Sequence, residues 1–456
     1  MAQRANGQLD TVICGARLVT DRGLMEADVG LCDGRIAALG TRLEGEERVD
    51  ARGLWILPGA IDGHTHMEAP AFGRTTRDTF ESGTRAAAAG GVTTVVDFTV
   101  GNGETTLAEQ ICARLEMIRH SVVDVALHAE VVAWRADRTG EVADAIRAGV
   151  TSFKFYTVYA ERSTPDELAD AFRAIARAGG VAMIHAEDPD GIDAASRSLS
   201  PRERASMTAF PRSRPAQSEV TAVERVCALA EATGVRLHVA HVSTAGAVAA
   251  IAGAKAQGVR VTAETCPHYL LLDEGVYARA DGCQWSVIPP LRRHGGQTAL
   301  WSALASGTLD TIATDHCPFV RADKEDSSDA LGTPCGLPGV ETLLPLAYSE
   351  GVARRGLSPE WLTRVLSRNP ARIFDLASRK GTLDVGADAD VVLFDPAREW
   401  TVSASRLHMN TDFSPFEGLR VRGAVVRTYV RGRCVFGDGE FLAQPGWGRF
   451  AAGSVL

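Results

Sequence analysis

The stretch LPGAIDGHTHMEAP, residues 57–70, decides the fold, because an apolar run ends there in two histidines that bracket one threonine. Side chains of a β-strand alternate between its two faces, so His64 and His66 point to one place while Thr65 turns away. Two imidazoles that face one point are suited to a metal ion. An isolated H-x-H is a weak motif, and two unrelated histidines on a surface turn are its alternative interpretation.

Seven more short, apolar, β-branched runs follow this one and are typical of buried strands. In chain order the eight runs are LWILPGAID, GVTTVVDFT, VDVALHAEV, VTSFKFYTV, GVAMIHAE, VRLHVAHVS, VRVTAETC and TLDTIATDH. Most gaps between them hold helical patterns. The clearest is TPDELADAFRAIARAGG, in which Thr164 is a helix cap, Pro165 opens the helix and Gly179 ends it.

Strands that alternate with helices predict a parallel sheet, and eight such units predict an α/β fold of the TIM type, a (β/α)₈ barrel. A doubly wound open sheet is the alternative. It would carry a glycine-rich phosphate turn after its first strand, and the sequence has none there.

The two ends of the chain differ from its middle, because their sequences predict short strands separated by D-R-G and D-G turns. Neither end is long enough for a core of its own, so together they predict one small β-sandwich. We expect residues 1–55 to form the N-terminal part of this sandwich, residues 56–380 the barrel, and residues 381–456 the C-terminal part of the sandwich and a tail. Residues 189–217 and 320–339 read as long loops or short helices, where substrate contacts usually lie.

Composition argues against several classes of protein. The 456 residues carry a net charge of −9 without a basic stripe, so we expect no nucleic-acid partner. No run of 18 apolar residues predicts a membrane span, and the start, MAQRANGQLD, lacks the apolar core of a signal peptide. The nine cysteines are scattered without a C-x-x-C pair, which disfavours disulfides and a thiolate zinc site and predicts a reducing cytoplasm.

Ionisable residues gather at the predicted strand ends. These are His64 and His66 on the first strand, Lys154 in SFKFY, His185 in IHAE, His241 in AHVS and Asp315 in ATDH. Barrel active sites lie at the C-terminal ends of the strands, so these side chains converge. Burying them without partners costs several kcal/mol, and they therefore predict a metal centre.

Lys154 is the unexpected member of this set, because its ammonium group would be repelled by divalent cations. Carboxylation by CO₂ would convert the side chain to a carbamate whose two oxygens can bridge two metals. The alternative is a lysine that extends its head group into solvent. The buried strand SFKFY argues against that alternative.

The chain resembles the cyclic amidohydrolases, most closely the hydantoinase and dihydropyrimidinase branch. The resemblance covers nearly the whole length and rests on PGAIDGHTHMEAPAFG, DTFESGTRAAAAGGVTTVVDF, SFKFYTVY, VAMIHAED, HVAHVST, AETCPHYL, PPLR, ATDHCPF and RNPARIFDLASRKGTLDVGADADVVLFDP. It implies a homotetramer or homodimer that hydrolyses a small cyclic amide with two divalent metal ions. Zinc is the usual metal of this family.

The resemblance also implies a role for each residue of the set. His64, His66 and Asp315 would hold one metal, and His185 and His241 the other. N6-carboxylated Lys154 would bridge the two metals. Two metals would activate a water molecule for attack on the ring carbonyl. Asp315 would shuttle the proton to the leaving ring nitrogen, and Tyr159, five residues after Lys154, would stabilise the oxyanion. A buried tyrosine at a strand end is the alternative for Tyr159.

Several residues bear on which ring the protein binds. Dihydroorotases have an arginine where this chain has Glu68, and an acid there would repel a carboxylate. Ile288 stands before PPLR where hydantoinases usually have a serine, and Cys335 stands where they have an asparagine. Both are expected substrate contacts.

The stretches ETCPHYL and GVETLLPL look more like those of allantoinases or dihydroorotases. An allantoinase, or another cyclic ureide or imide hydrolase, therefore stays open as an alternative activity. Some relatives of dihydropyrimidinase are non-enzymatic scaffolds that have lost metal ligands. This chain keeps all six candidate ligands, which argues against that class.

Overall fold

The computed structural model describes residues 8–20 and 23–455, so most of the start in which no signal peptide is predicted lies outside the described residues. Eight parallel strands form the central sheet, in the order β17-β16-β15-β14-β13-β12-β11-β8. Their bounds are β8 (Ala60–Thr65), β11 (Val92–Phe98), β12 (Asp124–Glu130), β13 (Ser152–Tyr156), β14 (Val181–His185), β15 (Arg236–Val239), β16 (Val261–Thr265) and β17 (Thr311–Ile312). The predicted parallel sheet is confirmed.

The sheet closes on itself just past its first and last strands. Thr65 and His316 form a parallel bridge, and the amide N–H of His66 donates to the carbonyl of His316 at 2.7 Å. A doubly wound sheet would leave these two edges apart. The (β/α)₈ barrel is therefore the observed fold, and the open-sheet alternative is wrong.

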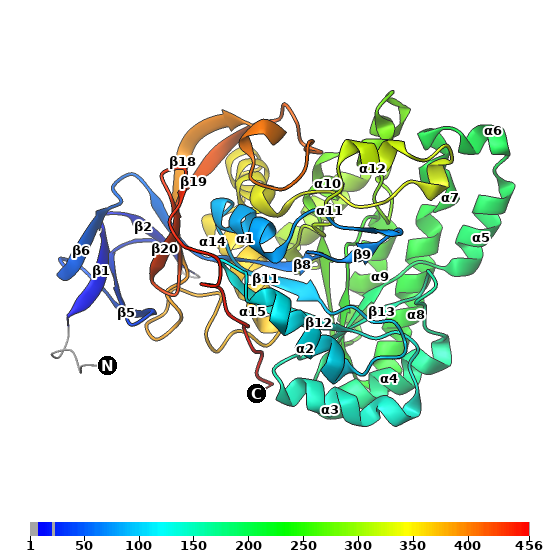
Figure 1. The fold of residues 1–456 in the computed structure, drawn as a ribbon, viewed down its shortest axis with the longest axis horizontal. Coiled ribbons are helices and arrows are strands. Elements are labelled where there is room, and N and C mark those ends of the chain that lie inside the picture. Colours follow the sequence, from blue (N-terminus) through cyan, green and yellow to red (C-terminus); the bar gives the residue numbers. More distant parts are fainter. Residues whose placement is uncertain (1–7, 21–22, 456) are drawn as a thin grey trace.

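Helices alternate with the strands and cover the outside of the barrel (Figure 1). The main ones are α1 (Phe80–Ala89), α2 (Leu107–Ile118), α3 (Thr139–Arg147), α4 (Pro165–Ala178), α8 (Ala216–Thr233), α9 (Ala245–Ala256) and α11 (Gly296–Ser306). As expected, the side chain of Thr164 caps α4 by accepting from Glu167 N, and Gly179 ends the helix with a φ of 80°. None of the helices in the described ranges combines the length and the apolar character that a bilayer crossing requires.

Short helices occupy the segments predicted as long loops and complete the last part of the barrel. They are α5 (Pro189–Ser198), α6 (Pro201–Arg204), α7 (Phe210–Ser213), α10 (Pro267–Leu271), α12 (Arg321–Glu325), α13 (Leu343–Ala347), α14 (Pro359–Thr363) and α15 (Asn369–Ile373). A two-stranded ribbon, β9 (Pro70–Ala71) with β10 (Arg74–Thr75), lies between the first strand and α1.

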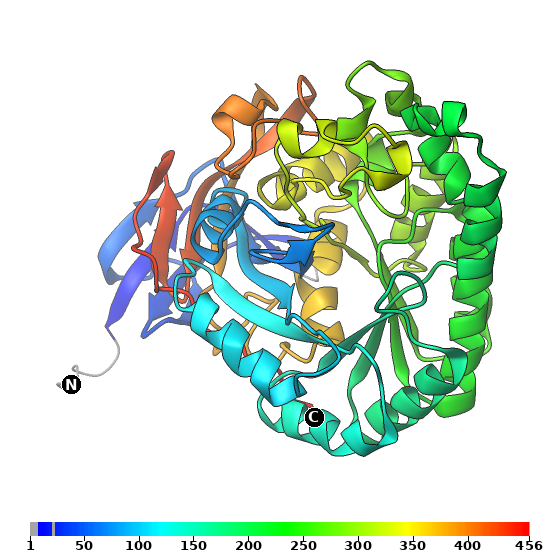
Figure 2. The same ribbon diagram turned by 45° about the vertical axis from the view of Figure 1, so that its right-hand side comes forward.

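The two ends of the chain lie side by side beside the barrel, as the blue and red strands of Figures 1 and 2 show. One sheet has the order β5-β4-β1-β6 and the other β21-β20-β19-β18-β7-β2-β3. The bounds are β1 (Leu9–Cys14), β2 (Arg17–Thr20), β3 (Gly23–Glu26), β4 (Asp28–Cys32), β5 (Arg35–Gly40), β6 (Gly45–Asp50), β7 (Trp55–Pro58), β18 (Val391–Thr401), β19 (Arg420–Val430), β20 (Arg433–Gly437) and β21 (Glu440–Phe441). A shared apolar core, which includes Ile13, Leu31, Val391 and Tyr429, joins both chain ends. The domain boundaries at residues 55 and 380 stay a prediction.

The first predicted strand run, LWILPGAID, is divided in the structure. Its first half is β7, which pairs with β18 of the terminal sheet, and its second half is β8 of the barrel. Gly59 separates them, and a Cβ there would collide with the side chain of Thr93. Hydrophobicity does not mark this division, because both halves are apolar and mostly buried, but the Pro58-Gly59 pair inside the run is a turn signal.

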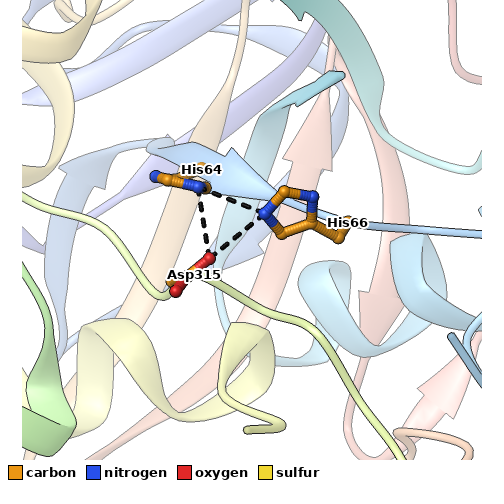
Figure 3. A group of neighbouring side chains, drawn as sticks. All are labelled: His64, His66 and Asp315. Atoms are coloured by element: carbon orange, nitrogen blue, oxygen red, sulfur yellow. Dashed lines mark hydrogen bonds and ion pairs between the residues drawn. The ribbon is translucent and has the colours of Figure 1, made fainter. Parts of the chain in front are cut away.

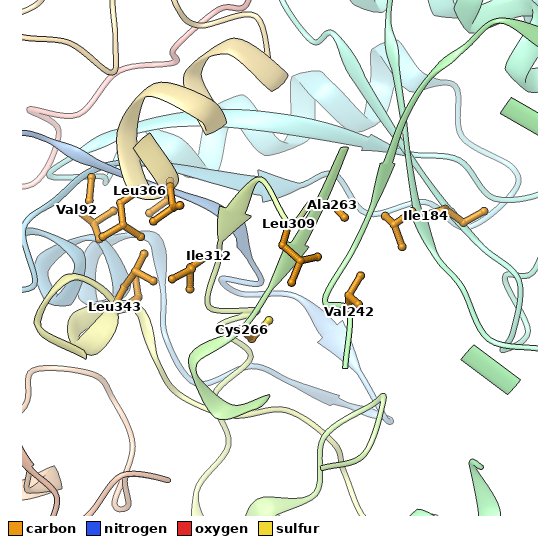
Figure 4. Packing of buried hydrophobic residues seen from close by; sticks show 14 of the residues in the cluster. Val92, Ile184, Val242, Ala263, Cys266, Leu309, Ile312, Leu343 and Leu366 are labelled. Atoms are coloured by element: carbon orange, nitrogen blue, oxygen red, sulfur yellow. The ribbon is translucent and has the colours of Figure 1, made fainter. Parts of the chain in front are cut away.

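The largest core cluster fills the space between the barrel strands and their helices. Figure 4 shows a part of it, in which Val92, Ile184 and Ala263 come from three different strands, and Leu343 and Leu366 of later helical segments lie near Val92. Fully burying one such side chain contributes about 1.5–3 kcal/mol. This packing holds the strand ends in fixed positions.

A buried ion cluster ties the barrel to the C-terminal part of the chain. Lys380 Nζ lies 2.6 Å from carboxylate oxygens of Asp124 and Asp390 and 3.1 Å from one of Asp388. Arg431 makes a further ion pair with Asp124. Asp124 opens β12 at the end of the barrel away from the predicted site, so the cluster is structural.

We expect Lys380→Met to lower the free energy of unfolding by about 3–5 kcal/mol, because it leaves buried carboxylates facing one another without their shared cation. Denaturant unfolding followed by circular dichroism measures the loss. Lys255→Met is the matched control. It removes one partly exposed pair with Asp310, 2.8 Å apart, and should cost about 1 kcal/mol or less. Equal losses in the two variants would contradict a special role for the cluster.

Candidate metal centre

All nine predicted site residues line one cavity of about 760 Å³ at the C-terminal ends of the barrel strands. They are His64, His66, Lys154, Tyr159, His185, His241, Ile288, Asp315 and Cys335. The histidines and Asp315 stand at or just beyond the ends of β8, β14, β15 and β17, whereas Lys154 lies within β13. The structure therefore brings the whole predicted set together, and the role of each residue stays a prediction.

His64, His66 and Asp315 form a triangle of ligand atoms (Figure 3). The Nε2 atoms of the two histidines are 3.2 Å apart, and each is 3.2 Å from Asp315 Oδ1. Ligand atoms about 2.0–2.1 Å from one tetrahedral zinc ion lie roughly 3.3 Å from each other. His64 Nδ1 lies 2.5 Å from Glu264 Oε1 and carries the hydrogen, which leaves Nε2 with its lone pair toward Asp315. The triangle fits a divalent metal ion.

His185 and His241 form a second group beside this triangle. His185 Nδ1 lies 3.0 Å from His241 Nε2, and the ring centroid of His241 is 5.5 Å from that of His64. The other nitrogen of His185, Nε2, donates to Glu187 Oε2 at 2.8 Å, so its Nδ1 keeps a lone pair. A carboxylate that orients a histidine in this way is typical of metal ligands.

The electrostatics of the cavity favour neutral imidazoles. Burial, followed by the positive charge of Lys154, lowers the pKa of His64 well below its usual value. Burial lowers the pKa of His185, and burial with the charge of His185 lowers that of His241 well below its usual value. Metal binding requires the unprotonated ring, so these shifts prepare the side chains as ligands.

Lys154 is buried with an exposed fraction of 1%, and its Nζ lies 5.1 Å from the ring centroid of Phe98 and 5.3 Å from that of Tyr156. Burial lowers the pKa of its amine to about 8. Compared with an ordinary lysine, this raises the neutral fraction at pH 7 by roughly two orders of magnitude. The side chain does not extend into solvent, so the snorkelling alternative is wrong.

Three site residues adopt the left-handed backbone conformation that side chains with a Cβ rarely adopt. The φ angles are 71° at Tyr159, 38° at His241 and 52° at Asp315. Residues held in this region cost about 1–3 kcal/mol each and cluster at functional sites. Each lies two or three residues past the end of a strand, and each lines the cavity.

Three glutamates of the site were not predicted from the sequence. Glu187 and Glu264 hold His185 and His64, and Glu264 Oε2 also lies 3.2 Å from His238 Nε2. Glu130 lines the cavity at the end of β12. For Glu187 a signal existed, because it stands two residues after His185 in IHAE. Glu264 is 200 residues from His64 in the chain, and no local pattern connects them.

Glu68 does not act as the sequence argument assumed. Its carboxylate accepts from Phe80 N at 3.3 Å, at the start of α1, and Glu68 is not among the cavity-lining residues. The φ angle of Glu68 is 46°, so the strand alternation that links His64 and His66 does not extend to it. Repulsion of a carboxylate by Glu68 is therefore wrong as an argument against dihydroorotase.

Comparison with known proteins identifies the family of this chain. The profile of the amidohydrolase family matches residues 55–435, and the chain belongs to that family. The D-hydantoinase of Geobacillus stearothermophilus is 36% identical over 96% of this chain and 95% of its own length. The allantoinase of Rubrobacter xylanophilus is 39% identical over 97% of each chain. The crystal structure of dihydropyrimidinase from Brevibacillus agri superposes with a TM-score of 0.96 at 34% identity, over 98% of this chain and 99% of that one.

We expect Glu187→Gln to weaken metal binding about ten- to a hundredfold, because the amide cannot hold His185 as the carboxylate does. Competition with a chromogenic chelator measures the affinity. Glu341→Gln is a matched control, since Glu341 is also buried and also lies 2.8 Å from a histidine, His408, away from the cavity. An affinity unchanged in Glu187→Gln would show that the Glu187 carboxylate does not support a metal ligand.

Proposed function

We propose that this protein is a hydrolase that opens the C–N bond of a cyclic amide, a hydantoin or dihydropyrimidine ring. One observation carries the proposal: four histidines, an aspartate and a buried lysine whose pKa is lowered to about 8 meet in one cavity. The relatives named D-hydantoinase and dihydropyrimidinase, which match nearly the whole chain, support the choice of substrate class.

The proposed cofactor is a pair of divalent metal ions, with zinc as the expected metal. His64, His66 and Asp315 would hold one ion, and His185 and His241 the other. When bound, the pair would lower the pKa of a water molecule and polarise the ring carbonyl. The donor set supports this assignment, because each imidazole offers one lone pair to the cavity and Asp315 offers an anionic oxygen.

Lys154 would join the two ions after carboxylation. Its neutral amine adds to the carbon of CO₂ and loses one proton, so the product is a carbamate with two oxygens and a negative charge. The lowered pKa of Lys154 supports this step, because only the free amine reacts. Carboxylation also removes the positive charge that would repel the metals.

Asp315 and Tyr159 would supply the remaining chemistry. Asp315 accepts the proton of the attacking water and later delivers it to the ring nitrogen that leaves. Its Oδ1 faces both histidines, which leaves Oδ2 for the proton. Burial raises the pKa of Tyr159 well above its usual value, so its hydroxyl stays protonated and can donate to the developing oxyanion.

A second candidate is allantoinase or another cyclic ureide or imide hydrolase, favoured by Ile288 and Cys335 in the cavity wall and by the 39% identical allantoinase. A dihydroorotase is disfavoured, because the cavity lining holds no arginine free to bind a carboxylate: Arg74 is paired with Asp326 at 2.6 Å. A non-enzymatic scaffold is disfavoured, because all six candidate metal ligands are present.

We place the enzyme in the cytoplasm as a homotetramer or homodimer, with a small-molecule substrate and neither nucleic-acid nor membrane partners. The nine cysteines are scattered along the sequence without a C-x-x-C pair, which supports a reducing compartment.

The first test is ring opening of dihydrouracil by protein reconstituted with zinc in the presence of bicarbonate. We expect hydrolysis and about two zinc ions per chain. With CO₂-free buffers the activity should fall strongly. Protein treated with ¹³C-bicarbonate should show a carbamate carbon signal by NMR, and Lys154→Ala should lack both the signal and the activity.

Lys255→Ala is the control for this experiment, because Lys255 lies on α9 and pairs with Asp310 away from the cavity. Hydrolysis that is independent of bicarbonate and survives in Lys154→Ala would contradict the bridging role. If the protein holds zinc but opens neither dihydrouracil nor hydantoin, allantoin and cyclic imides become the favoured substrates.

We expect Tyr159→Phe to lower kcat about 10²- to 10³-fold with little change in KM, because the hydroxyl acts on charge that develops in the transition state. Steady-state kinetics with dihydrouracil measures both constants. Tyr429→Phe, in the core of the terminal sheets, is the control and should leave both constants unchanged. A change in KM alone would assign Tyr159 to substrate binding instead.

A further inference from the structure

One wall of the cavity takes no part in the proposed metal chemistry. It is formed at the ends of three adjacent strands, β11, β12 and β13, and includes Gly101, Glu130, Tyr156 and Glu161. We name these four residues the acidic wall, because Glu130 and Glu161 are the carboxylate residues besides Asp315 that line the cavity in the described chain.

The acidic wall and the residues expected to contact the ring amide follow different strands. Ile288 and Cys335 stand on loops after β16 and β17, whereas Glu130 ends β12 and Tyr156 ends β13. In a closed ring of eight strands, β12 and β16 are four places apart, as are β13 and β17. All four residues line the same cavity, so a ring whose amide edge contacts the Ile288 and Cys335 loops can place its substituent against the acidic wall.

Glu130 is held rigidly and still has accepting capacity. Its Oε1 accepts from the Tyr156 hydroxyl at 2.7 Å, and its Oε2 accepts from Gly101 N at 2.7 Å. Each carboxylate oxygen has a second lone pair, and these are open to a donor in the cavity. The Tyr156 ring is 5.9 Å from that of Tyr159, so the wall adjoins the reacting centre.

No cation on the cavity lining offsets this charge for a substrate. Lys154 and Arg74 are the lysine and arginine residues that line the cavity in the described chain. Lys154 belongs to the metal set, and the guanidinium of Arg74 is paired with Asp326 at 2.6 Å and with Asp323 at 3.4 Å. The acidic wall therefore repels a carboxylate substituent. An alkyl or phenyl substituent would cover the buried oxygens of Glu130 without donating a hydrogen bond to them.

We propose that Glu130, supported by Tyr156 and Glu161, selects ring substrates whose substituent is a cation that donates N–H groups, such as an ammonium or guanidinium group. The inference rests on the proposed ring hydrolysis and names its substrate class. Glu130 acts as a specificity residue that binds the substituent and takes no part in bond breaking. An uncharged apolar substituent would have to desolvate the carboxylate without replacing its hydrogen bonds.

The test compares two hydantoins of equal shape, 5-(3-aminopropyl)hydantoin and 5-butylhydantoin, which differ by an ammonium in place of a methyl group. We expect the zinc-loaded wild type to show a kcat/KM about ten- to a hundredfold higher for the aminopropyl ring. Glu130→Gln should reduce this ratio at least tenfold, and Glu161→Gln should reduce it less. The ratio within one variant cancels any general loss of activity or folding yield.

Each outcome has one meaning. A wild-type ratio near one, or a ratio that Glu130→Gln leaves unchanged, overturns the selective role of Glu130. A wild type that prefers 5-butylhydantoin overturns it as well. If the wild type holds zinc and opens neither ring, nor unsubstituted hydantoin, the proposed hydrolysis fails and this inference fails with it. If the wild type hydrolyses unsubstituted hydantoin but its kcat/KM ratio for the two substituted rings is near one, the proposed hydrolysis stands and only the selective role of Glu130 is overturned.

Discussion

The backbone seam that closes the barrel is the contact on which the site depends. His66 N donates to the carbonyl of His316 at 2.7 Å, and His316 N donates to the carbonyl of His64 at 3.3 Å. The last strand, β17, has only two residues, so these bonds extend the barrel beyond it. The same residues flank the metal triangle. Closing the barrel therefore brings Asp315 against His64 and His66, and a sheet left open at this seam would have no triangle.

Buried carboxylates form hydrogen bonds to residues of the seam and of the loops beside it. Asp62 accepts from Thr314 N at 2.9 Å, Asp97 accepts from Met67 N at 2.9 Å, and Asp78 lies 3.0 Å from His316 Nε2. An unpaired buried charge would cost several kcal/mol, whereas one that receives backbone N–H groups fixes the loop that supplies them. The loops at the strand ends are thus rigid before any ligand binds, which is what a metal centre requires of its ligands.

The sequence predicts the parts of this structure that follow from local periodicity. Strand alternation places His64 with His66, and the rule that barrel sites lie at C-terminal strand ends gathers the distant ligands. Two kinds of feature escape such reasoning. Glu264 reaches His64 across 200 residues, a contact that only the closed barrel creates. Glu68 leaves the strand geometry with a φ of 46°, so alternation fails there. Hydrophobicity also does not mark the division of one apolar run at Gly59, where only the Pro58-Gly59 turn pair indicates it.

The proposed chemistry and the proposed selectivity rest on different parts of the fold. The candidate metal ligands and their carboxylate partners stand on strands or within three residues of strand ends, whereas Ile288 and Cys335 stand on loops. Glu130 is a strand-end residue, but its side chain touches Gly101 and Tyr156 and none of the histidines by hydrogen bond. A change at Glu130 can therefore alter the accepted substituent without moving a ligand. Relatives named D-hydantoinase and allantoinase both match nearly the full chain at 36% and 39% identity, as expected if one scaffold serves several rings.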